Sequence, residues 1–213
     1  MSKLYQVAVI GAGIGKEHLK GYSTISKKFK VKYVCDLDLE RAKKITDNSN
    51  IIITNNFDEV LKDDEINIID ICLPPHLHFE FCKNALESGK EVICEKPLVS
   101  NLKEVDELIL VSQKTKKNIF PVFQYRYGLG TTQLKSIVDA GLAGMPFIAS
   151  LETHWNRDSN YYSIDWRGTW KGEQGGAILG HAIHIHDLLR MVFGEVSSVY
   201  AKLTTRVSVP VCF

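Results

Sequence analysis

The sequence lacks a long hydrophobic run and a dominant charge of one sign. Its 213 residues carry 26 Lys and Arg against 25 Asp and Glu, which gives a net charge of +1, so there is no electrostatic case for binding nucleic acid or a membrane surface. No apolar stretch approaches the roughly 18 residues that suggest a membrane span. Residues 1–4 lead directly into an expected strand, without the apolar core of a signal peptide. We therefore expect a cytoplasmic protein with neither nucleic-acid nor membrane partners.

Paired cysteines are also missing. The chain has five cysteines, none of which forms C-x-x-C, and an odd number argues against a disulfide framework. Cys35, Cys72 and Cys94 lie in or at the ends of expected buried strands, where cysteine behaves as a small hydrophobe. This pattern favours a reducing, cytosolic setting. No H-E-x-x-H motif is present, and we predict no metal site.

What the sequence does contain, over residues 1–122, is an alternation of short apolar runs and helical patterns. Strands that are apolar throughout belong to a parallel sheet covered by helices on both faces, so we predict a doubly wound α/β domain. The expected strands are Gln6–Ile10, Val31–Cys35, Ile51–Thr54, Ile66–Cys72, Glu91–Cys94 and Ile119–Phe123. The expected helices are Lys16–Ser26, Leu39–Asp47, Phe57–Lys62, His76–Ser88 and Leu102–Lys116.

Residues 123–213 change character and predict a second, α+β domain. Two strands and two helices make a poor independent domain, and Val207–Phe213 still looks strand-like where the chain stops. We expect a truncated chain, or one whose last residues a frameshift has altered. The expected elements are a helix at Thr131–Ala140, a strand at Pro146–Trp155, a long loop at Asn156–Glu173, a helix at Ala177–Phe193 and a strand at Val196–Leu203.

A glycine-rich turn follows the first expected strand. Gly11, Gly13 and Gly15 have G-x-G-x-G spacing, one residue shorter than the usual G-x-G-x-x-G, whose sixth position here is Lys16. Glycines at such a turn let the backbone approach a pyrophosphate and present amides at a helix N-terminus. The place of this turn, between a strand and a helix at the start of an alternating chain, favours a dinucleotide site over a plain tight turn.

Asp36 closes the second expected strand about 20 residues beyond the glycines, which is the usual ribose-binding distance. A carboxylate there accepts hydrogen bonds from the adenosine hydroxyls and repels a 2′-phosphate, which favours NAD over NADP. Asp38 is the neighbouring competitor for this role. The alternative interpretation of Asp36 is the N-cap of the helix that begins at Leu39, and one aspartate can serve both purposes.

A proline-rich loop follows the fourth expected strand. Pro74 and Pro75 stop the strand, and Pro75 is suited to the first turn of a helix. Because this loop end lies at the same sheet edge as the glycine turn, we expect it to flank the cofactor. His76 and His78 follow, and first-turn surface histidines are the commoner case, so neither is expected to be catalytic.

Glu95-Lys96-Pro97 follows the fifth expected strand, at the sheet edge where open α/β sheets present groups to ligands. Lys96 at this place can donate to a substrate hydroxyl and favour its alkoxide-like form during hydride transfer. Pro97 restricts Lys96 to an extended backbone, and the bond between them is open to either isomer. The alternative is a surface ion pair that ends a strand.

A histidine-rich helix lies in the second part of the chain, where His181, His184 and His186 precede Asp187. A histidine with a near-neutral pKa is a natural acceptor for a hydroxyl proton. His181, His184 and Asp187 are three apart and share a stripe, but three such residues on one helix diverge too far to chelate one ion unaided. The remaining alternative is a packed, hydrogen-bonded histidine cluster.

These segments together resemble the Gfo/Idh/MocA family of NAD(P)-dependent oxidoreductases over nearly the whole chain. The resemblance implies a Rossmann domain, residues 1–122, followed by an α/β domain with a large open, mostly antiparallel sheet, of which residues 123–213 hold a part. It also implies that Lys96 is the active-site lysine and His184 the general acid/base. The family commonly has an aspartate four residues before that histidine, where this chain has Gly180, and His181 is a candidate for the supporting role.

We therefore expect an NAD-dependent dehydrogenase that acts on a secondary alcohol of a sugar, cyclitol or similar polyol and that forms a dimer or tetramer at full length. The alternatives are a non-catalytic NAD-binding sensor and an inactive fragment of the enzyme. The expected cofactor contacts are Gly11, Gly13, Ile14, Gly15, Asp36, Pro74, His78, Glu95 and Lys96. The expected substrate contacts are Arg126, Trp166, Arg167 and His181.

Overall fold

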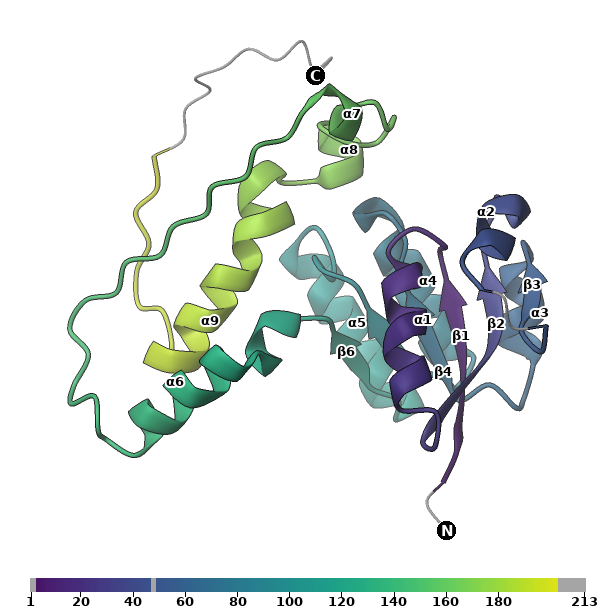
Figure 1. The fold of residues 1–213 in the computed structure, drawn as a ribbon, viewed down its shortest axis with the longest axis horizontal. Helices are drawn as coiled ribbons and strands as arrows, with labels where there is room; N and C mark the ends of the chain where they lie inside the picture. Colours follow the sequence, from purple (N-terminus) through teal and green to yellow (C-terminus); the bar gives the residue numbers. More distant parts are fainter. Residues whose placement is uncertain (1–2, 47–48, 203–213) are drawn as a thin grey trace. The chain divides into compact units, whose positions relative to one another are not determined.

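The computed structural model describes residues 3–46 and 49–202. The chain divides into two compact units, Met1–Val122 and Phe123–Phe213 (Figure 1). Within the described ranges, no helix is long and apolar enough to cross a membrane. The expected strand-like end at Val207–Phe213 and the cysteine at 212 lie outside these ranges.

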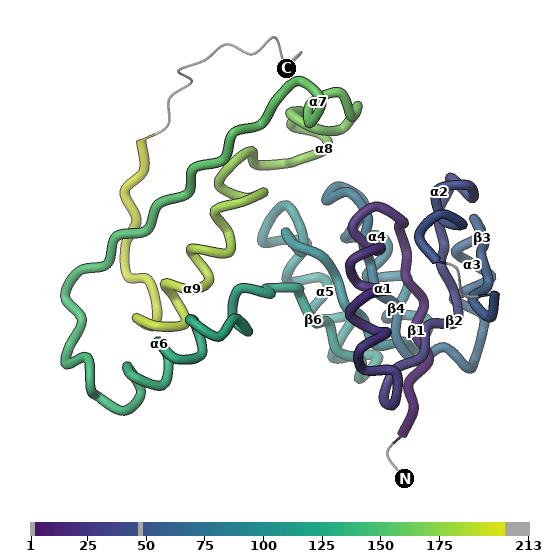
Figure 2. Tube along the Cα trace, viewed as in Figure 1, coloured from purple at the N-terminus to yellow at the C-terminus, as the bar shows by residue number. Residues whose placement is uncertain are grey.

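The first unit is built on a six-stranded sheet with the order β3-β2-β1-β4-β5-β6, in which every neighbouring pair is parallel (Figures 1 and 2). The predicted doubly wound sheet is therefore confirmed. Its strands are β1 (Tyr5–Ile10), β2 (Phe29–Cys35), β3 (Ile52–Thr54), β4 (Ile68–Ile71), β5 (Glu91–Cys94) and β6 (Ile119–Pro121). Its helices are α1 (Gly15–Thr24), α2 (Leu39–Lys44), α3 (Phe57–Lys62), the short 3-10 turn η1 (Pro75–Leu77), α4 (His78–Glu87) and α5 (Leu102–Thr115).

Two hydrophobic layers cover the two faces of this sheet. Along β1, Ala8 and Ile10 point into the layer formed with α3, α4 and α5. Val7 and Val9 point into the opposite layer, formed with α1 and α2. This alternation explains why the strands are apolar throughout, since both faces are buried. The strand order reverses between β1 and β4, and such a sheet binds ligands outside the carboxyl ends of its strands at that reversal.

Short polar side chains begin several of these helices. Asp38 accepts a hydrogen bond from the Arg41 backbone and thereby caps α2, and Asn101 accepts one from the Glu104 backbone and caps α5. The predicted helix at His76–Ser88 is divided, because the chain first makes the turn η1 with Pro75 at its start. The observed helix starts thus agree with the starts predicted from the sequence to within a few residues.

The second unit consists of helices and extended chain in its described part. Its elements are η2 (Gln124–Tyr127), α6 (Leu129–Asp139), α7 (Ser159–Tyr162), α8 (Trp170–Glu173), the π-helical turn η3 (Ile178–Ala182) and α9 (Ile183–Phe193).

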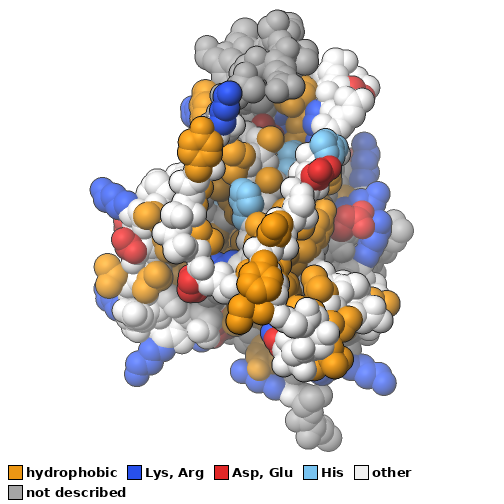
Figure 3. All heavy atoms as spheres, turned by 90° about the vertical axis from the view of Figure 1, so that its left-hand side faces the viewer, with side chains coloured by type: hydrophobic (Ala, Val, Ile, Leu, Met, Phe, Trp, Pro, Cys, Tyr) orange, Lys and Arg blue, Asp and Glu red, His pale blue; other side chains and the backbone are white. Residues whose placement is uncertain are grey.

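The predicted strands at Pro146–Trp155 and Val196–Leu203 are wrong for the residues the structure describes, since neither segment is a strand. A strand needs a hydrogen-bonded neighbour, and these segments pair with none in the described chain. The predicted open antiparallel sheet is likewise not formed by these residues. Large hydrophobic side chains are exposed along the extended segments, among them Phe147, Ile148 and Tyr200. Figure 3 shows hydrophobic side chains at the surface of one face of the molecule.

The cysteines within the described residues behave as the sequence predicts. Cys35, Cys72, Cys82 and Cys94 are all free thiols, and all are buried. Burial raises the pKa of Cys35 to about 11 and that of Cys72 to about 12, so both thiols stay protonated at neutral pH.

Candidate active site

The glycine turn joins β1 to α1, and its glycines meet different demands. Gly11 has φ +100°, and a Cβ there would lie 2.5 Å from the carbonyl oxygen of Cys72. A Cβ on Gly15 would lie 2.9 Å from Val9 Cγ1, so the third glycine lets α1 pack against the sheet. A Cβ on Gly13 would meet nothing within 4 Å, which leaves the middle of the turn open to a ligand. These are the three roles of a dinucleotide-binding turn, despite the shortened spacing.

Asp36 lies directly after β2 and binds the glycine turn. Its Oδ2 accepts a hydrogen bond of 2.6 Å from the Ala12 backbone, and its Oδ1 accepts bonds from the Asp38 backbone at 2.8 Å and from Arg41 Nη2 at 2.7 Å. Burial alone would raise the pKa of Asp36, but these three hydrogen bonds outweigh it and lower the pKa. The helix cap belongs to Asp38, so the alternative interpretation of Asp36 as the N-cap is wrong.

Glu95 and Lys96 follow β5 at the same sheet edge. The backbone N–H of Glu95 donates to the Ile71 carbonyl at 2.9 Å, and Glu95 Oε2 accepts a hydrogen bond of 3.1 Å from the Lys96 backbone. The Lys96–Pro97 peptide bond is cis. The Glu95 side chain is nearly buried and that of Lys96 half-buried. Because Glu95 binds the Lys96 backbone, it orients this loop.

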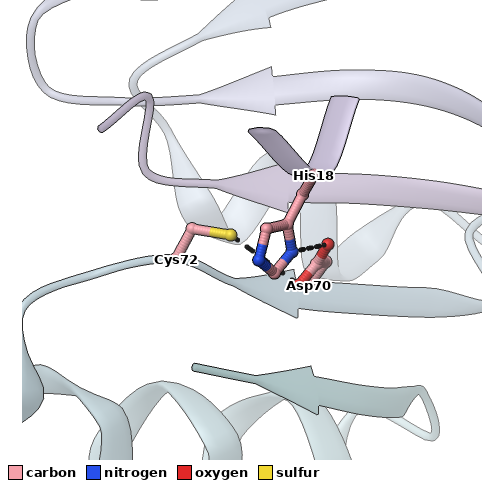
Figure 4. A group of neighbouring side chains, drawn as sticks. All are labelled: His18, Asp70 and Cys72. Carbon is pink, nitrogen blue, oxygen red and sulfur yellow. Dashed lines mark hydrogen bonds and ion pairs between the residues drawn. The ribbon is translucent and has the colours of Figure 1, made fainter. Parts of the chain in front are cut away.

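His18, on α1, connects Glu95 to the sheet. Its Nε2 lies 3.1 Å from Glu95 Oε1. Its Nδ1 lies 2.8 Å from Oδ2 of the fully buried Asp70 on β4, as Figure 4 shows. Asp70 also accepts hydrogen bonds from the Tyr22 hydroxyl at 2.9 Å and, more weakly, from Cys72 Sγ at 3.7 Å. These contacts form one buried network that joins α1, β4 and the loop after β5.

The network holds His18 as an imidazolium ion. Burial alone would lower the pKa of His18, but its interactions with Asp70, Cys72 and Glu95 outweigh burial and raise the pKa to about 12. For Glu95 the two effects have the opposite signs. Burial alone would raise the pKa of this carboxyl group, but the hydrogen bond and the charge of His18 outweigh burial and lower the pKa. With both ring nitrogens protonated, His18 donates to two carboxylates at once. The sequence offered little sign of this role, because His18 looks like an ordinary first-turn residue of a helix.

The same three side chains form a potential metal-binding group within the described residues, since ligand atoms of His18, Asp70 and Cys72 lie within 4.8 Å of one another. In this structure Asp70 joins the other two by hydrogen bonds to His18 and Cys72 (Figure 4), and the group also contacts Glu95 and Tyr22. The stripe formed by His181, His184 and Asp187 is not such a group.

The proline-rich loop after β4 is connected through His78 to the segment that carries Lys96 and Pro97. Pro74 is extended and precedes η1. The His78 side chain is fully buried, with Nδ1 2.6 Å from the Pro97 carbonyl and Nε2 2.8 Å from the Leu73 carbonyl. These contacts point to a positioning role for His78, which ties the Leu73–Pro74 loop to Pro97. Direct contact between His78 and a cofactor stays a prediction.

The second unit holds its own set of predicted site residues. His184 lies on α9, is 5% exposed, and stacks on the Tyr125 ring with the centroids 4.5 Å apart. Phe123 meets the same imidazole edge-on at 6.1 Å. Arg126 donates two hydrogen bonds to the Asp187 carboxylate, one of them from Nε at 2.7 Å. The predicted substrate residue Arg126 is therefore engaged with an acid, and it fixes η2 to α9.

Trp166, Arg167 and His181 lie in an aromatic region of this unit. The Arg167 guanidinium stacks over Trp166 and over Tyr161, with its carbon 4.4 and 4.0 Å from the ring centroids. The His181 ring lies 4.7 Å from that of Trp155. A Cβ on Gly172 would lie 2.1 Å from the Trp166 carbonyl oxygen, so only glycine permits this close turn. The sequence contains no sign of the contacts made by Trp155, Arg157 and Tyr161. Trp155 ended a predicted strand, and the other two lay in the predicted loop that follows it.

The parallel sheet, the glycine turn and the Asp36 carboxylate that binds this turn are the features of a dinucleotide-binding domain. The family model described as "Oxidoreductase family, NAD-binding Rossmann fold" matches residues 5–123, and a model of the GFO/IDH/MocA C-terminal domain matches residues 131–211. The chain belongs to the Gfo/Idh/MocA family of oxidoreductases, and the predicted resemblance is confirmed.

Several known proteins are similar to this chain. It is 33% identical over 205 residues to the uncharacterized oxidoreductase YrbE of Bacillus subtilis, which covers 95% of this chain and 58% of YrbE. It is 29% identical over 214 residues to levoglucosan dehydrogenase of Pseudarthrobacter phenanthrenivorans, covering 93% of this chain and 54% of that enzyme. The chain thus spans little more than half the length of these relatives.

Among solved structures, the WlbA dehydrogenase of Chromobacterium violaceum, in complex with NADH and UDP-GlcNAcA, has a TM-score of 0.84 at 26% identity. That match covers 91% of this chain and 56% of WlbA. The likeness extends over most of the described residues, and the solved chain is again much the longer of the two.

Proposed function

We propose that this protein is an NAD-dependent dehydrogenase that oxidises a secondary alcohol of a sugar, cyclitol or similar polyol. The observation that carries the proposal is the placement of Lys96. It follows β5 at the ligand-binding edge of the sheet, and Glu95, itself held by His18, binds its backbone. A positioned cation there is suited to a substrate oxygen that gains negative charge during reaction.

In the proposed reaction Lys96 donates a hydrogen bond to the reacting hydroxyl and stabilises the developing oxyanion. His184 accepts the hydroxyl proton, a role that suits an imidazole shielded from water by Tyr125 and Phe123. NAD⁺, when bound, accepts the hydride from the alcohol carbon. The glycine turn would hold its pyrophosphate, and Asp36 its ribose, since Gly13 is open and Asp36 ends β2.

We assign cofactor binding to residues 1–122 and a part of the substrate site to residues 123–213. Sugars and polyols are proposed as substrates because two of the similar proteins are named levoglucosan dehydrogenase and inositol 2-dehydrogenase. Trp166, Arg167 and His181 are the proposed substrate-side residues. A preference for NAD over NADP is proposed because a carboxylate directly after β2, beside the glycine turn, would repel a 2′-phosphate.

We also propose that the full-length protein is a homo-oligomer, a dimer or tetramer. Support comes from the exposed hydrophobic side chains of the second unit, of which Phe147 is 87% and Ile148 89% exposed. Light scattering of the full-length protein tests this directly, and a monomer at all concentrations would contradict it.

A cofactor-reduction screen tests the central proposal. Purified protein with NAD⁺ is offered a panel of aldoses, ketoses, inositols and sugar derivatives, and NADH formation is followed by absorbance. Turnover of at least one polyol is expected. NADH binding without turnover of any compound would instead favour a cofactor-binding sensor, and the absence of cofactor binding would favour an inactive fragment.

A further inference from the structure

The second unit contains a cavity of about 370 Å³ within its own residues. This volume is in the range of small-ligand sites. Four of the lining side chains are aromatic, and such faces offer apolar contact to the C–H face of a sugar ring. The lining residues are Thr153, Trp155, Arg157, Tyr161, Tyr162, Gly168, Thr169, Trp170, Glu173, Gly176, Ala177 and His181.

Arg157 is one of the lining residues, and its guanidinium packs against two aromatic rings. Its guanidinium carbon is 4.0 Å from the Trp155 ring centroid and 4.2 Å from that of Tyr161. Stacking of this kind fixes the plane of the guanidinium and leaves its N–H edges to bind an acceptor. One Nη atom lies 3.4 Å from His181 Nε2.

The positive charge of Arg157 has no acidic partner within residues 3–46 and 49–202. No salt bridge to Arg157 occurs there, and its buried Nε has no hydrogen-bond acceptor. Asp158, the adjacent acid, instead caps α7 by accepting a bond from the Tyr161 backbone at 3.0 Å. A buried donor on a charged group left unpaired is costly unless a ligand satisfies it.

Arg167, in the same region, differs from Arg157 in that its charge is paired with an acid. It also stacks on Tyr161, but its Nη1 lies 3.8 Å from Glu173 Oε1. Glu173 further accepts hydrogen bonds from the Tyr161 hydroxyl at 3.1 Å and from the Gly168 backbone at 3.0 Å. The acid of the cavity wall is therefore occupied by three donors of its own, and the wall presents Arg157 as its unneutralised charge.

We propose that this cavity binds the anionic group, a carboxylate or a phosphate, of a sugar derivative, and that Arg157 is its binding residue. This inference rests on the proposed function and narrows it from sugars in general to negatively charged sugars. A planar guanidinium matches both carboxylate and phosphate through two parallel hydrogen bonds. His181, which contacts Arg157 at 3.4 Å, precedes His184 by three residues along the same helical stretch.

The test compares ligands that share the glucose ring and differ in the group at C6, which is charged in two of them and neutral in the third. Calorimetry measures binding of D-glucuronate, D-glucose 6-phosphate and D-glucose to the NADH-loaded protein, so that the first two probes separate a carboxylate from a phosphate. We expect one of the anions to bind about tenfold or more tightly than glucose. Equal binding of all three, or no binding of either anion, would overturn the proposal without any variant.

Arg157→Gln is expected to abolish the preference for the anion, and Arg157→Lys to keep part of it. Arg190→Gln is the matched control, because Arg190 is paired with Glu195 at an exposed place, and it should retain the full preference. A preference that survives in Arg157→Gln would refute the assignment. The binding measurement also separates this site from the reaction: anion preference without turnover would count against Lys96 and His184, and turnover without anion preference would count against Arg157.

Discussion

His18 bridges two carboxylates, with Nε2 3.1 Å from Glu95 and Nδ1 2.8 Å from Asp70. The second of these acids is fully buried on β4, and the first binds the Lys96 backbone. One imidazolium ion on α1 thus links the buried charge of the sheet to the loop that carries the proposed active-site lysine. Through these contacts the backbone of the loop at Lys96 is tied to both α1 and β4.

Replacing His18 with Gln should destabilise the protein by about 3 kcal/mol, because Asp70 would keep a buried charge without its cation. Turnover should fall as well, since Glu95 would no longer be fixed, while KM for the sugar changes less. Urea unfolding and steady-state kinetics measure the two effects. Lys20→Gln on the same helix is the control: its ion pair with Glu17 is exposed, and a change within about 0.5 kcal/mol is expected. Equal stability of the two variants would contradict this account.

The stability that His18 provides should depend on pH in a defined direction. Because folding raises the pKa of His18 from 6.5 to about 12, its contribution is complete below pH 6.5 and declines as pH rises toward the folded value. The free energy of unfolding of the wild type should therefore exceed that of His18→Gln by more at about pH 6 than at about pH 9. Unfolding curves at the two pH values measure this gap, and a gap that widens at the higher pH would argue against an imidazolium.

The glycine turn predicts two different outcomes for two similar changes. Gly11→Ala should destabilise the fold by about 2 kcal/mol or more, since the methyl group meets the Cys72 carbonyl at 2.5 Å and φ is +100°. Gly13→Ala meets nothing within 4 Å and should change stability by less than about 0.5 kcal/mol. Its methyl group would instead occupy the space for the pyrophosphate and weaken NADH binding by about tenfold or more. Thermal unfolding and NADH fluorescence titration distinguish the two, and normal NADH affinity in Gly13→Ala would count against the turn as the cofactor site.

Replacing Asp36 with Ser should shift cofactor preference toward NADP. The change removes the carboxylate that repels a 2′-phosphate and releases Arg41, now bound to it at 2.7 Å, to meet that phosphate. The affinity ratio of NADPH to NADH is expected to rise by about tenfold or more. Asp38→Ser is the matched control, since serine preserves the helix cap, and its ratio should not change. A similar shift in both variants would show that Asp36 has no special part in discrimination.

The first unit could be predicted closely from the sequence. In the second unit the helices at Thr131–Ala140 and Ala177–Phe193 were predicted to within a few residues, whereas the strands were wrong. Runs such as Val7–Ile10 are apolar on both faces because both faces are covered, so their pattern carries the fold by itself. Pro146–Trp155 alternates as a strand would, but a strand exists only with a neighbour, and its described surroundings supply none. The local hydrophobic pattern is enough to predict a strand whose neighbours in the sheet are also present. It is not enough where the formation of a strand depends on a pairing partner that the pattern does not reveal.

The site shows the same division. The positions of Gly11 in a tight turn and of Asp36 at a strand end were predictable, because both depend on the local sequence. The bridge from His18 to Glu95 joins residues 77 apart. Arg157 is stacked between Trp155 and Tyr161, while the neighbouring acids Asp158 and Glu173 contact other groups. Such contacts depend on the tertiary structure, and they cannot be predicted from the spacing of residues in the sequence.

The most direct test of the central claim is the turnover of Lys96→Ala on the polyol that the wild type oxidises best. The account predicts that kcat falls by about a hundredfold or more, since a transition-state hydrogen bond is lost, while NADH affinity changes by no more than about tenfold. Lys90→Ala is the control on the amino-terminal side of β5, because Lys90 donates to the Asp63 carbonyl away from this edge. Full activity in Lys96→Ala would contradict the account.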